Sequence, residues 1–245
     1  MILPERMSVY INSLDTGNGA FLDDLQRFAV ENHVPVIRPD MQSFLKVLLA
    51  IHRPQRILEV GTAVGFSALL MAANTSPDCR ITTIENYEKR IPLARENFRR
   101  AGMEERITLL PGDAMKILPT LKEPFDFIFM DAAKGQYIHF LPEVLRLLRL
   151  DGVLLSDNVL QDGDIIESHY AIEQRDRTIY KRMREYLYVL KHTEGLLTSV
   201  VAVGDGAAVT VKQADVTVPG KNIDEAAETP ECAEAAGGLN TIDRE

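Results

Sequence analysis

The chain has 245 residues, of which 46% are hydrophobic and 26% are charged, and its formal net charge is −9. This length and composition are typical of one large globular domain, and no apolar run approaches the roughly 18 residues that a membrane span needs. We therefore expect a cytoplasmic protein with no membrane partner. The two cysteines, Cys79 and Cys232, are too few for a disulfide framework or a thiolate metal cluster.

In chain order, the apolar pattern first predicts two helices, over residues 22–32 and 41–51. Between residues 56 and 159, short β-type runs alternate with amphipathic segments, a pattern typical of βαβ units and a parallel sheet. The expected strands cover residues 56–60, 80–85, 106–110, 125–130 and 152–156. A helix is expected over residues 87–101, where apolar residues recur at helical spacing.

The C-terminal part predicts a long basic helix over residues 170–192 and then two strands, over 196–203 and 207–212. The turn Gly204-Asp205-Gly206 between these strands favours an antiparallel hairpin. We thus expect a doubly wound, Rossmann-like α/β fold of about seven strands over residues 1–213, with a mostly parallel sheet. Residues 214–245 are acidic, rich in Ala, Glu, Gly and Pro, and are expected to form a disordered tail.

A glycine turn follows the first predicted strand. Gly61 and Gly65 let the backbone approach a ligand closely, and a helix start follows them, although a plain tight turn would need the same residues. Glu85 ends the second strand, where an acidic residue of a nucleotide-binding domain accepts hydrogen bonds from ribose. Its alternative role is a carboxylate at a helix start. Asp113 follows the third strand and is expected to cap a helix, to lie beside an adenine, or both.

Oxygen-bearing side chains also follow the fourth and fifth strands. Asp131 ends the fourth strand, and Asp157 and Asn158 end the fifth. If these strands are neighbours, the three side chains share one edge of the sheet, and such hard oxygen ligands suit Mg²⁺ or a similar divalent cation. For Asp157 or Asn158 alone, a turn-capping role is the simpler interpretation. The combination with Asp131 and the nearby Lys134 favours a metal site.

Taken together, these motifs resemble the cation-dependent O-methyltransferases, the family of catechol and caffeoyl-CoA methyltransferases. The motifs are Glu59-Val-Gly-Thr-Ala-Val-Gly65, Thr83-Ile-Glu85, Gly112-Asp113-Ala114, Asp131-Ala-Ala-Lys-Gly-Gln-Tyr137, Asp157-Asn158 and Val203-Gly-Asp-Gly206. The resemblance implies S-adenosylmethionine as cofactor, Asp131, Asp157 and Asn158 as metal ligands, and Lys134 with Asp131 as catalytic residues. The cofactor contacts that it implies are Met41, Glu59, Gly61, Thr62, Gly65, Ser67, Glu85, Asp113, Ala114 and Asp131.

Within this family the chain is most similar to the bacterial tRNA 5-hydroxyuridine methyltransferases, which make 5-methoxyuridine at the wobble position. That likeness implies tRNA as partner, and a homodimer is also expected. The basic helix carries five candidate RNA contacts, Arg175, Arg177, Lys181, Arg182 and Arg184, among Tyr180, Tyr186 and Tyr188, whose rings could stack on bases. Most of the acidic charge lies in residues 214–245, so a basic patch elsewhere remains compatible with the net charge.

Two alternatives stay open. The helix is equally typical of a solvated helix with core tyrosines, in which case the acceptor would be a catechol-like or phenolic small molecule. A regulatory protein that binds a nucleotide without catalysis is less favoured, because binding alone requires neither Lys134 nor metal ligands.

Overall fold

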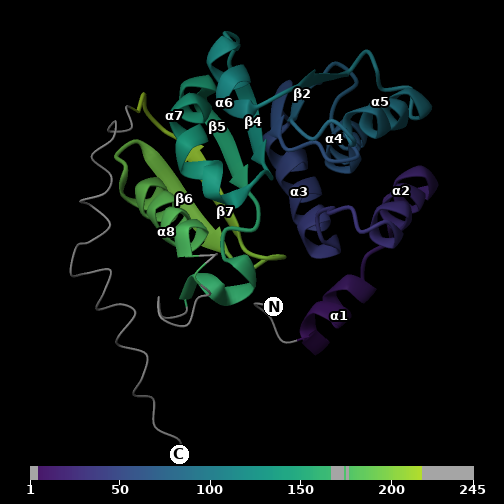
Figure 1. Cartoon of the computed structure of the whole chain (residues 1–245), viewed down its shortest axis with the longest axis horizontal. Coiled ribbons are helices and arrows are strands. Elements are labelled where there is room, and N and C mark those ends of the chain that lie inside the picture. The colour runs from purple at the N-terminus through teal and green to yellow at the C-terminus, as the bar shows by residue number, and fades with distance from the viewer. Residues whose placement is uncertain (1–4, 167–173, 175–176, 217–245) are drawn as a thin grey trace, which may run out of the picture.

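A computed structural model describes residues 5–166, 174 and 177–216, and a seven-stranded sheet forms its centre. The strands are β1 (Arg56–Val60), β2 (Arg80–Glu85), β3 (Ile107–Pro111), β4 (Phe125–Met130), β5 (Leu148–Ser156), β6 (Leu196–Val201) and β7 (Ala207–Lys212). Their order is β3-β2-β1-β4-β5-β7-β6, and β7 runs antiparallel to both neighbours while the other pairs are parallel (Figure 1). The predicted doubly wound fold with an antiparallel C-terminal hairpin is confirmed.

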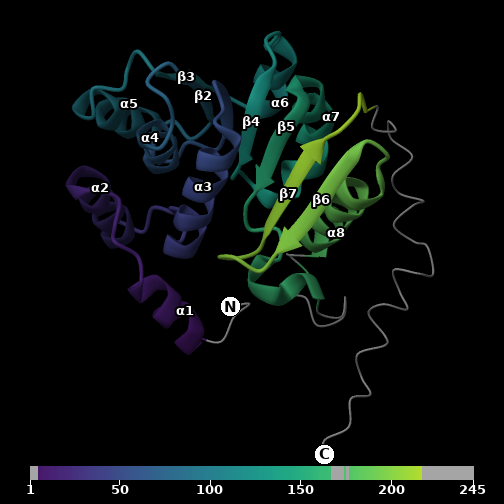
Figure 2. The ribbon, with the colours of Figure 1, turned by 180° about the vertical axis from the view of Figure 1, so that it is seen from behind.

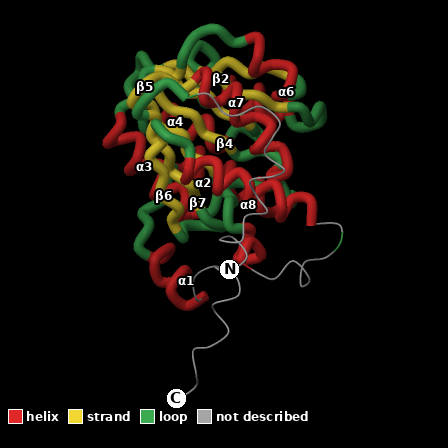
Figure 3. Tube along the Cα trace, turned by 90° about the vertical axis from the view of Figure 1, so that its left-hand side faces the viewer, coloured by secondary structure: helices red, strands yellow, loops and turns green. Residues whose placement is uncertain are grey.

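Helices cover both faces of this sheet. The described helices are α1 (Glu5–Ser13), α2 (Ala20–Glu31), α3 (Pro39–His52), α4 (Phe66–Ala73), α5 (Ile91–Arg100), α6 (Ala114–Ile117), α7 (Tyr137–Leu147) and α8 (Arg177–His192), with 3-10 turns η1 (Leu118–Thr120), η2 (Lys134–Gln136) and η3 (Gln161–Ile166). Residues of α2 to α5 share one core, and those of α6, α7 and α8 share the other (Figures 2 and 3). Ile57 enters the first core and Leu58 the second, so a strand is apolar on both faces.

Several boundaries differ from the predictions. β5 begins at Leu148 rather than at residue 152, because its pairing with β4 is interrupted and Asp151 adopts a left-handed φ of 60°. β6 ends at Val201, two residues early. The expected helix over residues 170–192 is seen from Arg177 onward. Of its first part only Gln174, in a turn, is described, and the tail beyond residue 216 lies outside the described residues. None of the described helices is long and apolar enough to cross a membrane.

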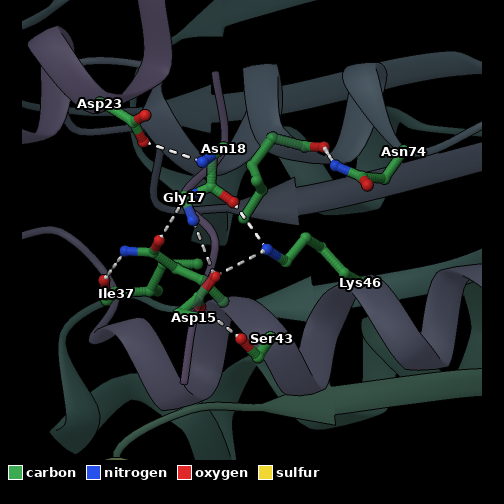
Figure 4. A network of polar contacts seen from close by, with 10 residues as sticks. Asp15, Gly17, Asn18, Asp23, Ile37, Ser43, Lys46 and Asn74 are labelled. Carbon is green, nitrogen blue, oxygen red and sulfur yellow. Dashed lines mark hydrogen bonds and ion pairs between the residues drawn. The ribbon is translucent and has the colours of Figure 1, made fainter. Parts of the chain in front are cut away.

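The N-terminal helix α1 is not predicted by the apolar pattern, and the segment after it is fixed to α3 by polar contacts. The carboxylate of Asp15 accepts a hydrogen bond from the Ser43 hydroxyl at 2.6 Å, and the Asn18 amide donates to the Gln42 side chain at 2.7 Å (Figure 4). Gln42 is buried and donates in turn to the carbonyl of Ile37 at 2.7 Å. The network therefore orders the chain that leads into α3.

Candidate active site

A cavity of about 720 Å³ lies at the carboxyl ends of the parallel strands. Its walls come from both sides of the point where the strand order reverses, between β1 and β4, which is where open α/β sheets bind ligands. Most of the predicted site residues line it: Met41, Gly61, Thr62, Ser67, Glu85, Asp113, Ala114, Asp131, Lys134, Asp157 and Asn158. The predicted cofactor and metal residues therefore face one shared space.

The glycine turn between β1 and α4 is set by packing as well as by access to a ligand. Gly61 has a φ of 106°, and a Cβ there would overlap the backbone carbonyl of Asp131. Gly65 has a φ of 86° and its Cβ would lie 2.5 Å from the Phe98 ring. Gly65 does not line the cavity and packs against Phe98 at the start of α4, and its expected cofactor contact stays a prediction.

Glu85 lies at the end of β2 with both carboxylate oxygens already in use. One oxygen accepts the backbone N–H of Ala63 at 2.7 Å, and the other accepts that of Tyr87 at 2.8 Å. Since α5 begins only at Ile91, Glu85 is not a helix-start carboxylate, and that alternative is wrong. Glu85 fixes the glycine turn and also faces the cavity, where a ribose could add hydrogen bonds.

Glu59 lies behind the cavity wall rather than on it. Its side chain is fully buried and accepts hydrogen bonds from the hydroxyls of Ser67, at 2.5 Å, and of Thr83. Burial raises its pKa to about 7 although both hydroxyls favour the ionised form. The structure therefore gives Glu59 the role of holding Ser67, which does line the cavity, instead of the direct cofactor contact expected from the sequence.

Asp113 caps a helix as one of its expected roles predicted, and its place beside an adenine stays a prediction. Its carboxylate caps α6 by accepting the N–H of Met115 at 2.9 Å, and the residue also lines the cavity beside Ala114. This wall lies next to β2 and Glu85, so it belongs to the nucleotide side of the cavity.

Two carboxylates and a lysine meet at the ends of β4 and β5. The ammonium group of Lys134 lies 3.2 Å from Asp131 Oδ1. Asp157 is 4% exposed, and burial, followed by the nearby charge of Asp131, raises its pKa to about 7. Two acids held this close repel each other, and a divalent cation between them would relieve that repulsion.

Asn158, the third predicted ligand, lines the cavity directly after Asp157. It adopts a left-handed φ of 58°, which asparagine tolerates, and its amide nitrogen donates to Asp205 at 3.2 Å. The amide oxygen is thereby the atom that could bind a cation. The described residues contain no cluster of three or more His, Cys, Asp or Glu side chains, so any cation here would rely on this amide. The donor set of two carboxylates and one amide oxygen fits a hard divalent cation.

Sequence reasoning missed an ion pair at the rim of the cavity. Arg38 contacts Asp205 at 2.5 Å, and Asp40 accepts the backbone N–H of Gly204 at 2.9 Å. The start of α3 and the residue before it are thus tied to the β6–β7 turn, next to Asn158. The sequence predicts Asp205 only as a turn residue. An acidic residue between two glycines is the one signal that could have indicated a contact there.

Two of the three tyrosines of the basic helix α8 do not face solvent, while Tyr188 is partly exposed and stacks on His192. Tyr180 and Tyr186 are buried, so the prediction that they stack on bases is wrong. Arg182 donates to the carbonyl of Gly135 at 3.1 Å, and Arg184 donates to that of Ile165 at 3.2 Å. Of the remaining basic candidates, Lys181 is exposed, Arg177 is half-buried, and Arg175 lies outside the described residues.

The chain belongs to a family described as O-methyltransferase, whose profile matches residues 12–213. It is 37% identical over 145 residues to the catechol O-methyltransferase of Mycobacterium tuberculosis. The aligned region covers 58% of this chain and 66% of that relative. It is 34% identical over 137 residues to the catechol O-methyltransferase of Niastella koreensis, covering 54% and 62%. Both matches thus span less than two thirds of the relative's length.

The fold is also similar to that of a solved relative with a bound ligand. The O-methyltransferase of Bacillus cereus, in complex with S-adenosylhomocysteine, matches with a TM-score of 0.74 at 25% identity. This match covers 84% of the present chain and 97% of the other.

Proposed function

We propose that this protein transfers a methyl group from S-adenosylmethionine to one of two adjacent oxygens of its substrate, with the help of a divalent cation. The observation that carries the proposal is one cavity in which the glycine turn and Glu85 face Asp131, Asp157 and Lys134. The bound S-adenosylhomocysteine in the Bacillus cereus relative and the printed activities of the catechol methyltransferases support it.

The cofactor side of the cavity would bind and orient the methyl donor. Glu85 would accept hydrogen bonds from the ribose, while Ser67, held by Glu59, and the turn at Gly61 would contact the amino-acid end of the cofactor. Orientation is a large part of this catalysis, because the acceptor oxygen must approach the methyl carbon in line with the breaking C–S bond.

On the other side, Asp131, Asp157 and Asn158 would hold the cation. When bound, it would supply charge that favours the ionised form of a neighbouring hydroxyl. Lys134 lies beside Asp131, where its ammonium group would stabilise the oxyanion; to receive the hydroxyl proton instead, it would first have to lose its own proton to solvent. The oxygen then forms its bond to the methyl group as the C–S bond breaks, which leaves S-adenosylhomocysteine.

The acceptor that we favour is a catechol-like small molecule. Arg182 and Arg184 are engaged with backbone carbonyls and two tyrosines of α8 are buried, so this helix offers fewer RNA contacts than its sequence predicts. A second candidate is 5-hydroxyuridine in tRNA, whose enolic form also has adjacent oxygens. What favours it is that α8, with its exposed Lys181, packs against η2, the turn that contains Lys134.

A label-transfer assay tests both the identity of the acceptor and the need for a divalent cation. The protein is incubated with methyl-labelled S-adenosylmethionine and either a catechol panel or undermethylated tRNA, with chelator and then with added Mg²⁺. We expect label in a catechol, lost with chelator and restored by Mg²⁺. Label in tRNA alone would select the second candidate, and full transfer in excess chelator would refute the cation.

A further inference from the structure

Tyr137 is a fully buried residue at the start of α7, directly after the turn that contains Lys134. Its hydroxyl lies 3.0 Å from the carbonyl oxygen of Met130 and 3.1 Å from that of Asp157. One phenolic proton can be shared between two acceptors in this way. The hydroxyl therefore joins two backbone positions that are 27 residues apart in the chain, at residues 130 and 157.

Both carbonyls belong to the ends of the strands that present the proposed metal ligands. Met130 is the last residue of β4 and immediately precedes Asp131, and Asp157 follows β5. The carbonyl of Met130 also accepts the N–H of Asp157 at 3.0 Å. Tyr137 thus adds a side-chain link where the regular pairing of β4 with β5 stops.

The ring of Tyr137 contacts a third member of the site. The Lys134 ammonium lies 5.9 Å from the ring centroid, within the range of a cation–π contact. On another side the ring packs edge-on against Tyr186, with a centroid separation of 5.5 Å. The orientation of the ring is therefore fixed by α8, while its hydroxyl and one face point to the residues of the site.

We propose that Tyr137 is a positioning residue that fixes the separation of Asp131 and Asp157 and so prepares the cation site. This inference rests on the proposed function. A phenylalanine would fill the same apolar space, and a buried hydroxyl is costly unless it is hydrogen-bonded. The bonds that this hydroxyl makes go to the backbone of the two carboxylate-bearing strand ends. Groups that hold metal ligands in place typically change metal affinity when they are removed.

The test compares Tyr137→Phe with Tyr186→Phe. Tyr186 is a matched control because it is also a fully buried tyrosine, and its hydroxyl bonds to the Ser156 hydroxyl at 2.6 Å instead of to a strand-end carbonyl. Calorimetry measures the binding of Mn²⁺ alone, and separately of S-adenosylhomocysteine, to the parent and both variants. Thermal melting shows how much each lost hydroxyl destabilises the fold.

For Tyr137→Phe we expect the Mn²⁺ dissociation constant to rise by about tenfold or more, as for other residues that support metal ligands. Binding of S-adenosylhomocysteine should stay within about twofold of the parent, and Tyr186→Phe should bind Mn²⁺ like the parent. Unchanged Mn²⁺ affinity in Tyr137→Phe, or an equal loss in both variants, would overturn the positioning role. A parent protein that binds S-adenosylhomocysteine but no Mn²⁺ would instead refute the cation site itself, and with it this inference.

Discussion

The two sides of the cavity differ in how far apart in the sequence their residues lie. The cofactor side is local: Glu85 holds the turn at Ala63, and the Asn97 side chain donates to the carbonyl of Val64 at 2.8 Å. The cation side collects residues from β4, β5, α8 and the β6–β7 turn, and it depends on contacts such as Arg182 with Gly135. The first side therefore draws mainly on consecutive βα units, from β1 to the start of α6, whereas the second collects residues from both sides of β5.

The two sides also differ in charge. The buried acid of the cofactor side, Glu59, has hydroxyl donors on both oxygens. On the cation side, Asp157 faces a second carboxylate, which helps to raise its pKa to about 7. Burial raises the pKa of both acids to about 7, but hydroxyl donors offset it at Glu59, whereas Asp131 adds repulsion at Asp157 that a cation would relieve.

The largest effect on methyl transfer should come from Asp157→Asn, which changes the cation side of the cavity and leaves the cofactor side as it is. The amide keeps the shape but removes a ligand charge, so we expect methyl transfer to fall by about three orders of magnitude or more. The melting temperature should stay the same or rise, because a repelling buried carboxylate has been removed. Affinity for S-adenosylhomocysteine, measured by calorimetry, should be unchanged, and a large loss there would contradict the division into two sides.

Gly61→Ala should instead damage both sides, because Gly61 is where they touch. A Cβ there would overlap the Asp131 carbonyl at a φ of 106°. We expect a loss of about 3 kcal/mol of unfolding free energy or more, from steric overlap together with backbone strain. The control is Gly102→Ala, at a φ of 66° with open space around it, which reports strain alone. Equal losses in both variants by chemical denaturation would show that the contact with Asp131 does not matter.

Glu59→Gln tests the cofactor side through pH. The pKa of Glu59 is raised from 4.5 to about 7, so the folded state binds its proton more tightly than the unfolded state does. Its contribution to stability is thus present below about pH 4.5 and is lost as pH rises through 7. From pH 5.5 to 8 we expect the parent to lose about 2 kcal/mol relative to Glu59→Gln. Parallel denaturation curves of parent and variant across this range would show that the carboxyl is not perturbed.

The smallest expected effect on methyl transfer comes from substitutions in α8. They distinguish a helix that supports the turn containing Lys134 from a helix that binds RNA. Arg182→Ala should lower transfer to any acceptor by about tenfold, roughly 1.4 kcal/mol, because Arg182 supports the turn that contains Lys134. Lys181→Ala is the matched exposed control and should leave transfer to a catechol unchanged. If tRNA is the acceptor, Lys181→Ala should weaken its binding and reduce the salt slope by about 0.7 to 0.9. If Arg182→Ala lowers transfer to tRNA but not to a catechol, Arg182 contacts RNA instead of supporting the turn.

The sequence by itself determined the sheet and the edge at which the site lies. Arg56–Val60, Arg80–Glu85 and Phe125–Met130 are strands as predicted, because continuous apolar runs between turn residues are a local signal. The acids that follow the strands were predicted to meet because parallel strands end at one edge of the sheet, and Asp131 and Asp157 do meet there. Neither inference required knowledge of side-chain packing.

Only the tertiary structure decided which way the side chains face. Tyr180 and Tyr186 point into a core and Arg182 reaches Gly135, although the sequence equally allowed a solvent-facing basic helix. Glu59 lies behind the cavity wall because Ser67 and Thr83, which are distant in sequence from each other, enclose it. The physical reason is that strand and helix periods are local properties, whereas the partner of a polar group is fixed only when separate elements pack together.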